Sequence, residues 1–121
     1  MAKIYKGTGS TQIGKYENGR LYEGTGSRVI ANISGDNVRE GTGSNVLFNV
    51  KSGSIRRGTG STVVATIKGE RICQGTGSTV IANIKDDKIR QGTGSTQIGR
   101  IDGMVNEEGM AAILSLLFNL F

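Results

Sequence analysis

A 17-residue unit is repeated six times in this chain without insertion or deletion. The tetrapeptide Gly-Thr-Gly-Ser opens each unit, at Gly7, Gly24, Gly41, Gly58, Gly75 and Gly92. A period this short and regular predicts one small supersecondary element per unit, which can bury its apolar face only against its neighbours. The repeat therefore constrains the fold of the 121-residue chain more than any other feature.

The end of each unit has the pattern of a tight β-hairpin. We number unit positions 1 to 17 from the first glycine. Positions 12 and 13 are rich in residues that tolerate positive φ, such as Asn18-Gly19 and Ser52-Gly53, and they predict two-residue type I′ or II′ turns. This register places position 9 opposite position 16, and position 10 opposite position 15. The 10:15 pairs are apolar in five units: Tyr16 with Leu21, Ile33 with Val38, Val50 with Ile55, Ile67 with Ile72, and Ile84 with Ile89.

The alternation of side chains sorts the unit into two faces. Positions 6, 8, 10 and 15 are mostly Val, Ala and Ile, and we expect them on the apolar face. Positions 9, 11, 14 and 16 are mostly Asn, Lys and Arg. Position 7 is apolar in every unit although it falls on the polar face: Ile13, Ile30, Leu47, Val64, Ile81 and Ile98. Either a β-bulge turns it inward or the polar face is partly covered.

The C-terminal segment differs from the repeats. Glu107 and Glu108 precede the apolar stretch Met110–Phe121, and this composition predicts a helix over residues 109–121. The stretch is apolar all round, so the helix requires burial on every side. Its twelve residues would rise only about 18 Å, which is too short to cross a bilayer. The segment is a core element, an oligomer contact or a membrane-inserting segment.

These patterns predict an all-β fold in a single domain, residues 1–121. We expect an antiparallel up-and-down meander of six hairpin repeats over residues 4–108, closed into a barrel of about 12 strands around the C-terminal apolar helix. Units 1 and 6 share the sequence of Gly7–Gly14 and Gly92–Gly99, which suits neighbours in a closed ring. The alternative fold is a β-solenoid with one unit per coil.

Composition argues against an enzyme. The chain has no histidine and one cysteine, Cys73, so we expect neither a Cys–His nucleophile nor a metal cluster. Gly-Thr-Gly-Ser lacks the following lysine of a phosphate-binding P-loop, and we expect no cofactor. The N-terminus has no apolar signal region and one cysteine allows no internal disulfide, which favours a cytoplasmic location.

The candidate functional residues are basic. The net charge is +5, and the register gathers cations on the polar sheet face, where arginine suits phosphate and carboxylate groups. The alternative is that the same residues form only a solvated face. The anionic-partner candidates are Arg39, Arg56, Arg90, Lys51, Lys68, Lys85, Arg71 and Lys88.

Three functions remain open from the sequence. The first is a non-enzymatic repeat scaffold that binds an unidentified partner, such as a protein, or forms a homo-oligomer through the C-terminal segment. The second is binding of an anionic polymer or membrane surface by the basic face. The third is ice binding, which requires a solenoid that aligns the position-2 threonines in a ladder: Thr8, Thr25, Thr42, Thr59, Thr76 and Thr93.

One unit resembles a known repeat. The segment from Gly14-Lys15-Tyr16-Glu17-Asn18-Gly19 to Gly24-Thr25-Gly26 is similar to the MORN-repeat pattern of glycines, an aromatic residue and Asn-Gly. The second glycine pair comes one residue late, and the other five units lack the aromatic residue. The resemblance implies a string of β-hairpins that contacts proteins or lipid surfaces.

Overall fold

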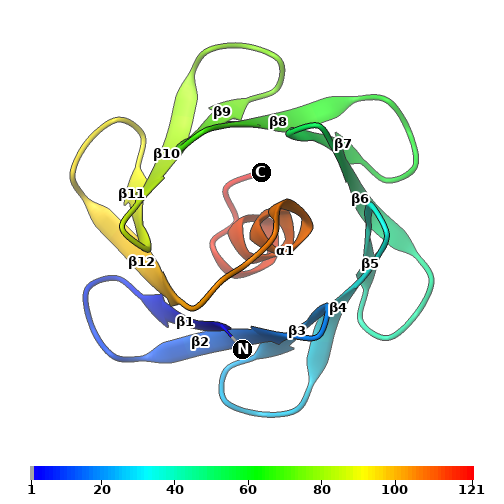
Figure 1. Ribbon diagram of the computed structural model, residues 1–121, viewed down its shortest axis with the longest axis horizontal. Coiled ribbons are helices and arrows are strands. Elements are labelled where there is room, and N and C mark those ends of the chain that lie inside the picture. Colours follow the sequence, from blue (N-terminus) through cyan, green and yellow to red (C-terminus); the bar gives the residue numbers. More distant parts are fainter. Residues whose placement is uncertain (1) are drawn as a thin grey trace.

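The computed structural model of the protein describes residues 2–121, which form a closed antiparallel barrel around a helical segment (Figure 1). The strands are β1 (Ala2–Lys6), β2 (Gln12–Glu17), β3 (Arg20–Glu23), β4 (Val29–Ser34), β5 (Asn37–Glu40), β6 (Val46–Lys51), β7 (Ser54–Arg57), β8 (Val63–Lys68), β9 (Arg71–Gln74), β10 (Val80–Lys85), β11 (Lys88–Gln91) and β12 (Gln97–Asp102). Each strand pairs with its neighbours in sequence, and β1 pairs with β12. The predicted meander barrel is confirmed, and the alternative solenoid is wrong.

The tight turns have the predicted chemistry. Asn18 and Gly19 both have positive φ, at 53° and 76°, as a type I′ turn requires. In the turn after β4, Gly35 alone has positive φ, which fits type II′. The resulting register is the one expected, because Ile84 lies opposite Ile89 and the 9:16 pairs include Asn32 opposite Arg39.

A β-bulge recurs between successive hairpins. Val80 lies opposite Cys73 and Ala82 lies opposite Ile72, so Ile81 at position 7 is the extra residue. The same shift occurs in all six pairings of this kind. The bulge turns position 7 toward the core and leaves position 6 on the outer face, opposite position 16. The expectation that position 6 belongs to the apolar inner face is therefore wrong.

The N-terminal strand closes the ring. β1 serves as the second strand of the sixth hairpin, and Ile4 lies opposite Ile101 as the sixth 10:15 pair. The strands thus run from Ala2 to Asp102, and the sixth unit itself supplies only β12. Residues 103–106 leave the wall and lead the chain into the lumen (Figure 1).

The C-terminal segment fills the barrel. Helix α1 (Glu107–Ala112) continues into a π-helical segment, η1 (Ile113–Leu117), so the helix starts before residue 109 and stops short of residue 121. Asn106 caps it, since its side chain accepts a 2.9 Å hydrogen bond from the Gly109 backbone N–H. Ile113 and Leu114 are fully buried, and they pack among the apolar residues of the inner wall. Of the three roles expected for this segment, the structure shows the core element.

Candidate functional site

The Gly-Thr-Gly-Ser loops project outward from the barrel wall like petals (Figure 1). One side chain donates a hydrogen bond to the first glycine carbonyl of each loop. The six bonds run from Gln97 to Gly7 (2.9 Å), Gln12 to Gly24 (3.1 Å), Asn32 to Gly41 (2.7 Å), Asn49 to Gly58 (2.9 Å), Thr66 to Gly75 (2.7 Å) and Asn83 to Gly92 (2.8 Å). Every petal is therefore fixed to the wall at the same point.

The donor comes from one of two unit positions. In units 2 to 5 it is the Asn or Thr at position 9. In units 1 and 6 position 9 is a cation, Lys15 or Arg100, and a glutamine at position 6 takes over. The bulge makes this exchange feasible, because it places position 6 on the outer face. This accounts for the sequence that units 1 and 6 share.

Under three of the petals the outer wall is hollowed into similar grooves. Each groove is bounded by the preceding hairpin turn, by the 9:16 cross-strand pair and by the next petal. We name them after the arginine at position 16. The Arg39 groove (about 340 Å³) is lined by Arg20, Asn32, Ser34 and Thr42; the Arg56 groove (about 580 Å³) by Asp36, Asn49, Lys51, Thr59 and Ser61; the Arg90 groove (about 570 Å³) by Glu70, Arg71, Asn83, Lys85, Thr93 and Ser95.

The guanidinium groups of two grooves have unused hydrogen-bonding capacity. The Nε atoms of Arg39 and Arg56 are buried and have no hydrogen-bond partner within the described residues. The amide groups opposite them, on Asn32 and Asn49, already donate to petal carbonyls. A buried donor without a partner costs about 1–3 kcal/mol, which an acceptor in the groove would recover.

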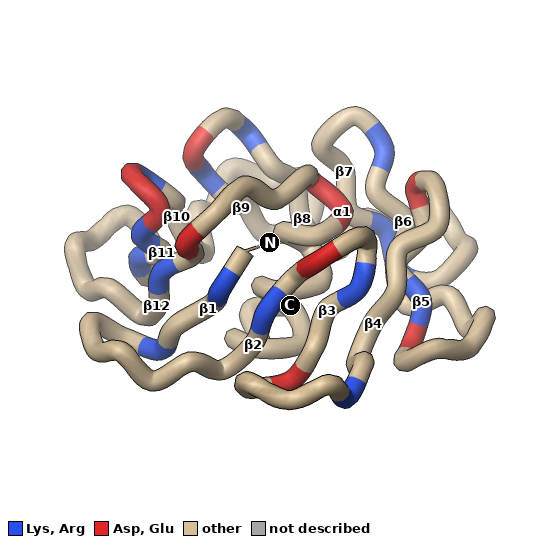
Figure 2. Tube along the Cα trace, turned by 60° about the horizontal axis from the view of Figure 1, so that its bottom comes forward, with Lys and Arg blue, Asp and Glu red and all other residues tan. Residues whose placement is uncertain are grey.

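Cations outnumber acids around these grooves. Over residues 2–121 the one ion pair joins Arg28 to Glu23 at 3.7 Å, and both side chains are largely exposed. By contrast, Lys85 lies directly opposite Lys88 across β10 and β11. Like charges in such positions repel each other. Figure 2 shows the Lys and Arg positions, in blue, along the wall, including the region around β10, β11 and β12.

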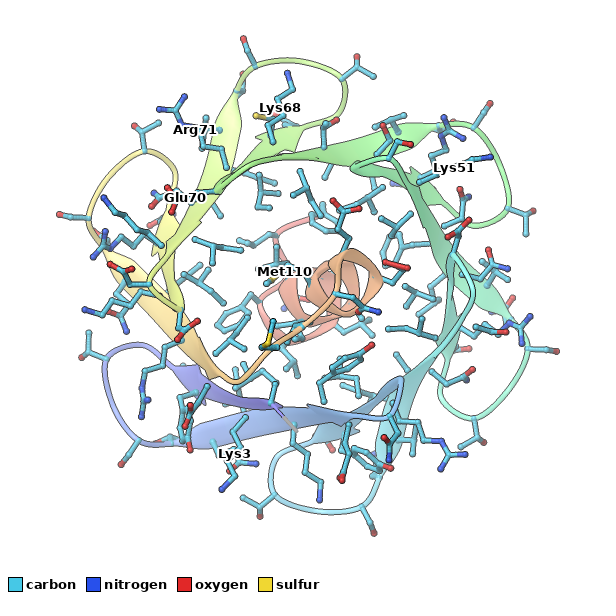
Figure 3. The ribbon with its side chains drawn as sticks, in the orientation of Figure 1. Lys3, Lys51, Lys68, Glu70, Arg71 and Met110 are labelled. Carbon is cyan, nitrogen blue, oxygen red and sulfur yellow. The ribbon has the colours of Figure 1, made fainter. Side chains whose placement is uncertain are left out.

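The structure separates the eight basic candidates of the sequence. Arg71, Lys85 and Arg90 meet in one groove, and Lys51 joins Arg56 in another. Arg39 shares its groove with Arg20, which sequence reasoning missed. Lys68 and Lys88 are exposed on the outer wall and line none of the three grooves. Figure 3 shows Lys51, Lys68 and Arg71 outside the wall, whereas Met110 lies in the lumen.

A family model described as the 6-fold beta flower protein matches residues 3–119, almost the whole length described. The chain belongs to the 6-fold beta flower protein family. The match is to this family and not to the MORN repeats that residues 14–26 resemble. No curated protein matches the chain, and no solved structure does.

The other three units of this beta flower have different outer pairs. In two of them a cation lies over a tyrosine ring, with Arg100 at 4.0 Å from the ring centre of Tyr5 and Lys15 at 5.0 Å from that of Tyr22. In unit 4 Thr66 lies opposite Cys73, a free and buried cysteine. The arginine grooves therefore occupy units 2, 3 and 5 of the ring.

Two further features are absent from residues 2–121 of the beta flower. Residues 2–121 contain no group of three or more His, Cys, Asp or Glu side chains placed to hold a metal ion. Within the same range, no helix combines the length and the apolar character that a membrane-spanning helix needs.

Proposed function

We propose that this beta flower is a non-enzymatic binding scaffold, in which each arginine groove takes one anionic group of a partner. The observation that carries the proposal is the pair of buried Nε atoms in Arg39 and Arg56 that lack an acceptor. Phosphate, sulfate and carboxylate oxygens are strong acceptors for a guanidinium fork. The petal hydroxyls of Thr59 and Ser61 add further donors beside Arg56.

The repeated construction favours an extended partner. The Arg39 and Arg56 grooves lie in consecutive units and have the same parts in the same order. A chain that carries several anionic groups can fill more than one groove, and each group after the first binds at high effective concentration. The partner class is therefore an acidic polymer or an acidic protein segment. The absence of histidine from the chain and the apolar inner wall also support a non-enzymatic role.

The test measures how strongly salt weakens polyanion binding. Labelled heparin fragments, duplex DNA and poly-glutamate are titrated against the protein at low and physiological salt. For DNA, log affinity decreases with log salt concentration, and each lost phosphate contact makes this slope less steep by about 0.9. We expect the double variant Arg39→Gln/Arg56→Gln to flatten this slope by about two units, with its fold intact.

The matched control is Arg28→Gln/Arg57→Gln, which removes two exposed charges outside the grooves. It should keep most of the slope if the grooves hold the ligand. Equal losses in both double variants would mean that net charge alone attracts the polymer. Equal losses, or no binding of any polyanion at low salt, would overturn the proposal.

A further inference from the structure

The mouth of the barrel on the petal side contains an apolar cleft, separate from the outer grooves. It measures about 620 Å³ and is lined mainly by Ile13, Ile98, Leu117, Phe118 and Leu120, with Lys6 at its rim. Sites for small organic ligands are typically about 300–1,000 Å³, apolar, and equipped with a few polar groups. The cleft has the size and lining of such a site.

The sequence of units 1 and 6 creates this space. At position 8 these units have Gly14 and Gly99, where the middle units have Ala31, Ala65, Ala82 or Phe48. A Cβ atom on Gly14 would lie 2.6 Å from Leu117, so the glycine lets the C-terminal segment lie directly on the wall. The bulged Ile13 and Ile98 then face the cleft from both sides of β1.

The last residue, Phe121, lies away from the cleft. The Phe121 ring packs edge-on against Phe48 of β6, with ring centres 5.8 Å apart. In the ring of twelve strands, β6 lies opposite β12, which carries Ile98. Phe121 therefore lies on the far side of the mouth, whereas Leu117, Phe118 and Leu120 border the cleft beside β12, β1 and β2.

Charge at the rim selects the ligand. Position 17 of units 1 to 5 and Lys6, at the equivalent place on β1, lie at this mouth, and the six rim residues around the ring are Lys6, Glu23, Glu40, Arg57, Gln74 and Gln91. The cleft opens beside Lys6 and Gln91, whereas the two carboxylates are on β3 and β5. An ammonium and a neutral amide at the opening suit a negatively charged head group.

We propose that the cleft binds a free medium-chain acyl carboxylate, with the chain among Ile13, Ile98 and Leu120 and the carboxylate beside Lys6. The site is independent of the arginine grooves. Burial of methylene groups supplies most of the affinity, because each contributes about 0.8 kcal/mol when removed from water. The exposed Lys6 supplies head-group preference.

The first experiment titrates decanoate into the full chain by calorimetry, with decyltrimethylammonium of equal chain length as the comparison. We expect decanoate to bind with one-to-one stoichiometry and the cation to bind more weakly. The variant Lys6→Met should weaken decanoate about two- to fivefold, as for an exposed ion pair. Arg57→Met, at the same unit position but outside the cleft, should leave the affinity unchanged.

The second experiment fills the cleft. Ile13→Phe should abolish decanoate binding, whereas Ile30→Phe, at the same position of unit 2, should retain it. As a measurement that needs no variant, decanoate should shift the methyl resonances of Ile13 and Ile98 and leave those of Ile55 unchanged. Absence of binding, equal loss in both phenylalanine variants, or shifts at Ile55 instead would overturn the proposal. So would binding to phosphatidylglycerol vesicles without binding of free decanoate, since this would show a membrane contact.

Discussion

The hydroxyl of Tyr16 donates a 3.0 Å hydrogen bond to the side-chain oxygen of Asn106, which links β2 to the cap of α1. The same oxygen accepts the Gly109 N–H at 2.9 Å. Tyr16 is the one aromatic residue at position 10, where the other units have Ile or Val. It fixes the start of the helix to the inner wall, across 90 residues of sequence.

Removal of this hydroxyl should loosen the helix in the barrel. We expect Tyr16→Phe to lower the free energy of unfolding by about 1 kcal/mol, the usual net value of such a bond, and urea unfolding measures the change. Tyr22→Phe removes a hydroxyl from the outer face and serves as the control. An equal loss in both variants would contradict the role given to Asn106.

The same tyrosine makes stability depend on alkaline pH. Burial raises the pKa of Tyr16 above its usual value of 10.0, and nearby Glu108 raises it further. The folded protein therefore holds this proton more tightly than the unfolded chain. Its contribution to stability is complete below pH 10 and is lost as the pH rises through the raised pKa.

We expect the stability difference between the wild type and Tyr16→Phe to stay constant below about pH 10 and to shrink as the pH rises above this value. Unfolding curves at each pH measure the difference, and the lysine titrations common to both proteins cancel. A difference that stays constant or grows with pH would contradict the raised pKa.

The exchange of petal donors between units can be reproduced by substitution. Gln97→Val gives unit 6 the position-6 residue of the middle units and leaves the Gly7 carbonyl without its donor, at a cost of about 1 kcal/mol. Adding Arg100→Asn restores the middle-unit arrangement and should recover stability. The rate of backbone amide hydrogen exchange in the petal at residues 7–10 should rise in the single variant and return to the wild-type rate in the double variant. A double variant that stays as unstable as the single one would contradict this equivalence.

Gly99 is required by packing rather than by backbone conformation. A Cβ atom there would overlap the Phe118 ring and lie 2.8 Å from the backbone oxygen of Tyr5, which cannot move freely. We expect Gly99→Ala to cost about 1–3 kcal/mol. Thermal unfolding measures the loss, and Gly43→Ala, whose nearest Cβ neighbour is at 3.6 Å, is the control. A Gly99→Ala variant as stable as the control would show that the C-terminal segment packs elsewhere.

Local chemistry made the hairpins predictable. Asn18-Gly19 determines a turn of known length, and the turn determines that Tyr16 lies opposite Leu21. The barrel and its buried helix then followed, because about twelve adjacent strands leave long edges unless they close. The basic candidates at position 16 were correctly placed on the outer face for the same reason.

The remaining features depend on contacts between units. The bulge at Ile81 adds a residue without changing the 17-residue period. The only sign of the bulge in the sequence is therefore the apolar residue at position 7. The role of β1 was missed, although Ile4 and Tyr5 match positions 15 and 16 of a unit. The grooves and the hydrogen bond from Asn32 to its petal could not be predicted from the sequence, because a petal and its donor belong to different units. The start of α1 at Glu107 depends on the Asn106 cap.

Closure by β1 also determines how such a ring assembles and opens. Eleven of the twelve strand pairings join consecutive strands, and only β1 with β12 joins segments from the two ends of the ring. The entropy lost on closing a loop grows with the logarithm of its length, so the largest single loss falls on this one pairing. We therefore expect the consecutive strands to pair first and the seam between β1 and β12 to form last. A ring that parts at the seam exposes two unpaired strand edges, and either edge can then pair with the complementary edge of another copy.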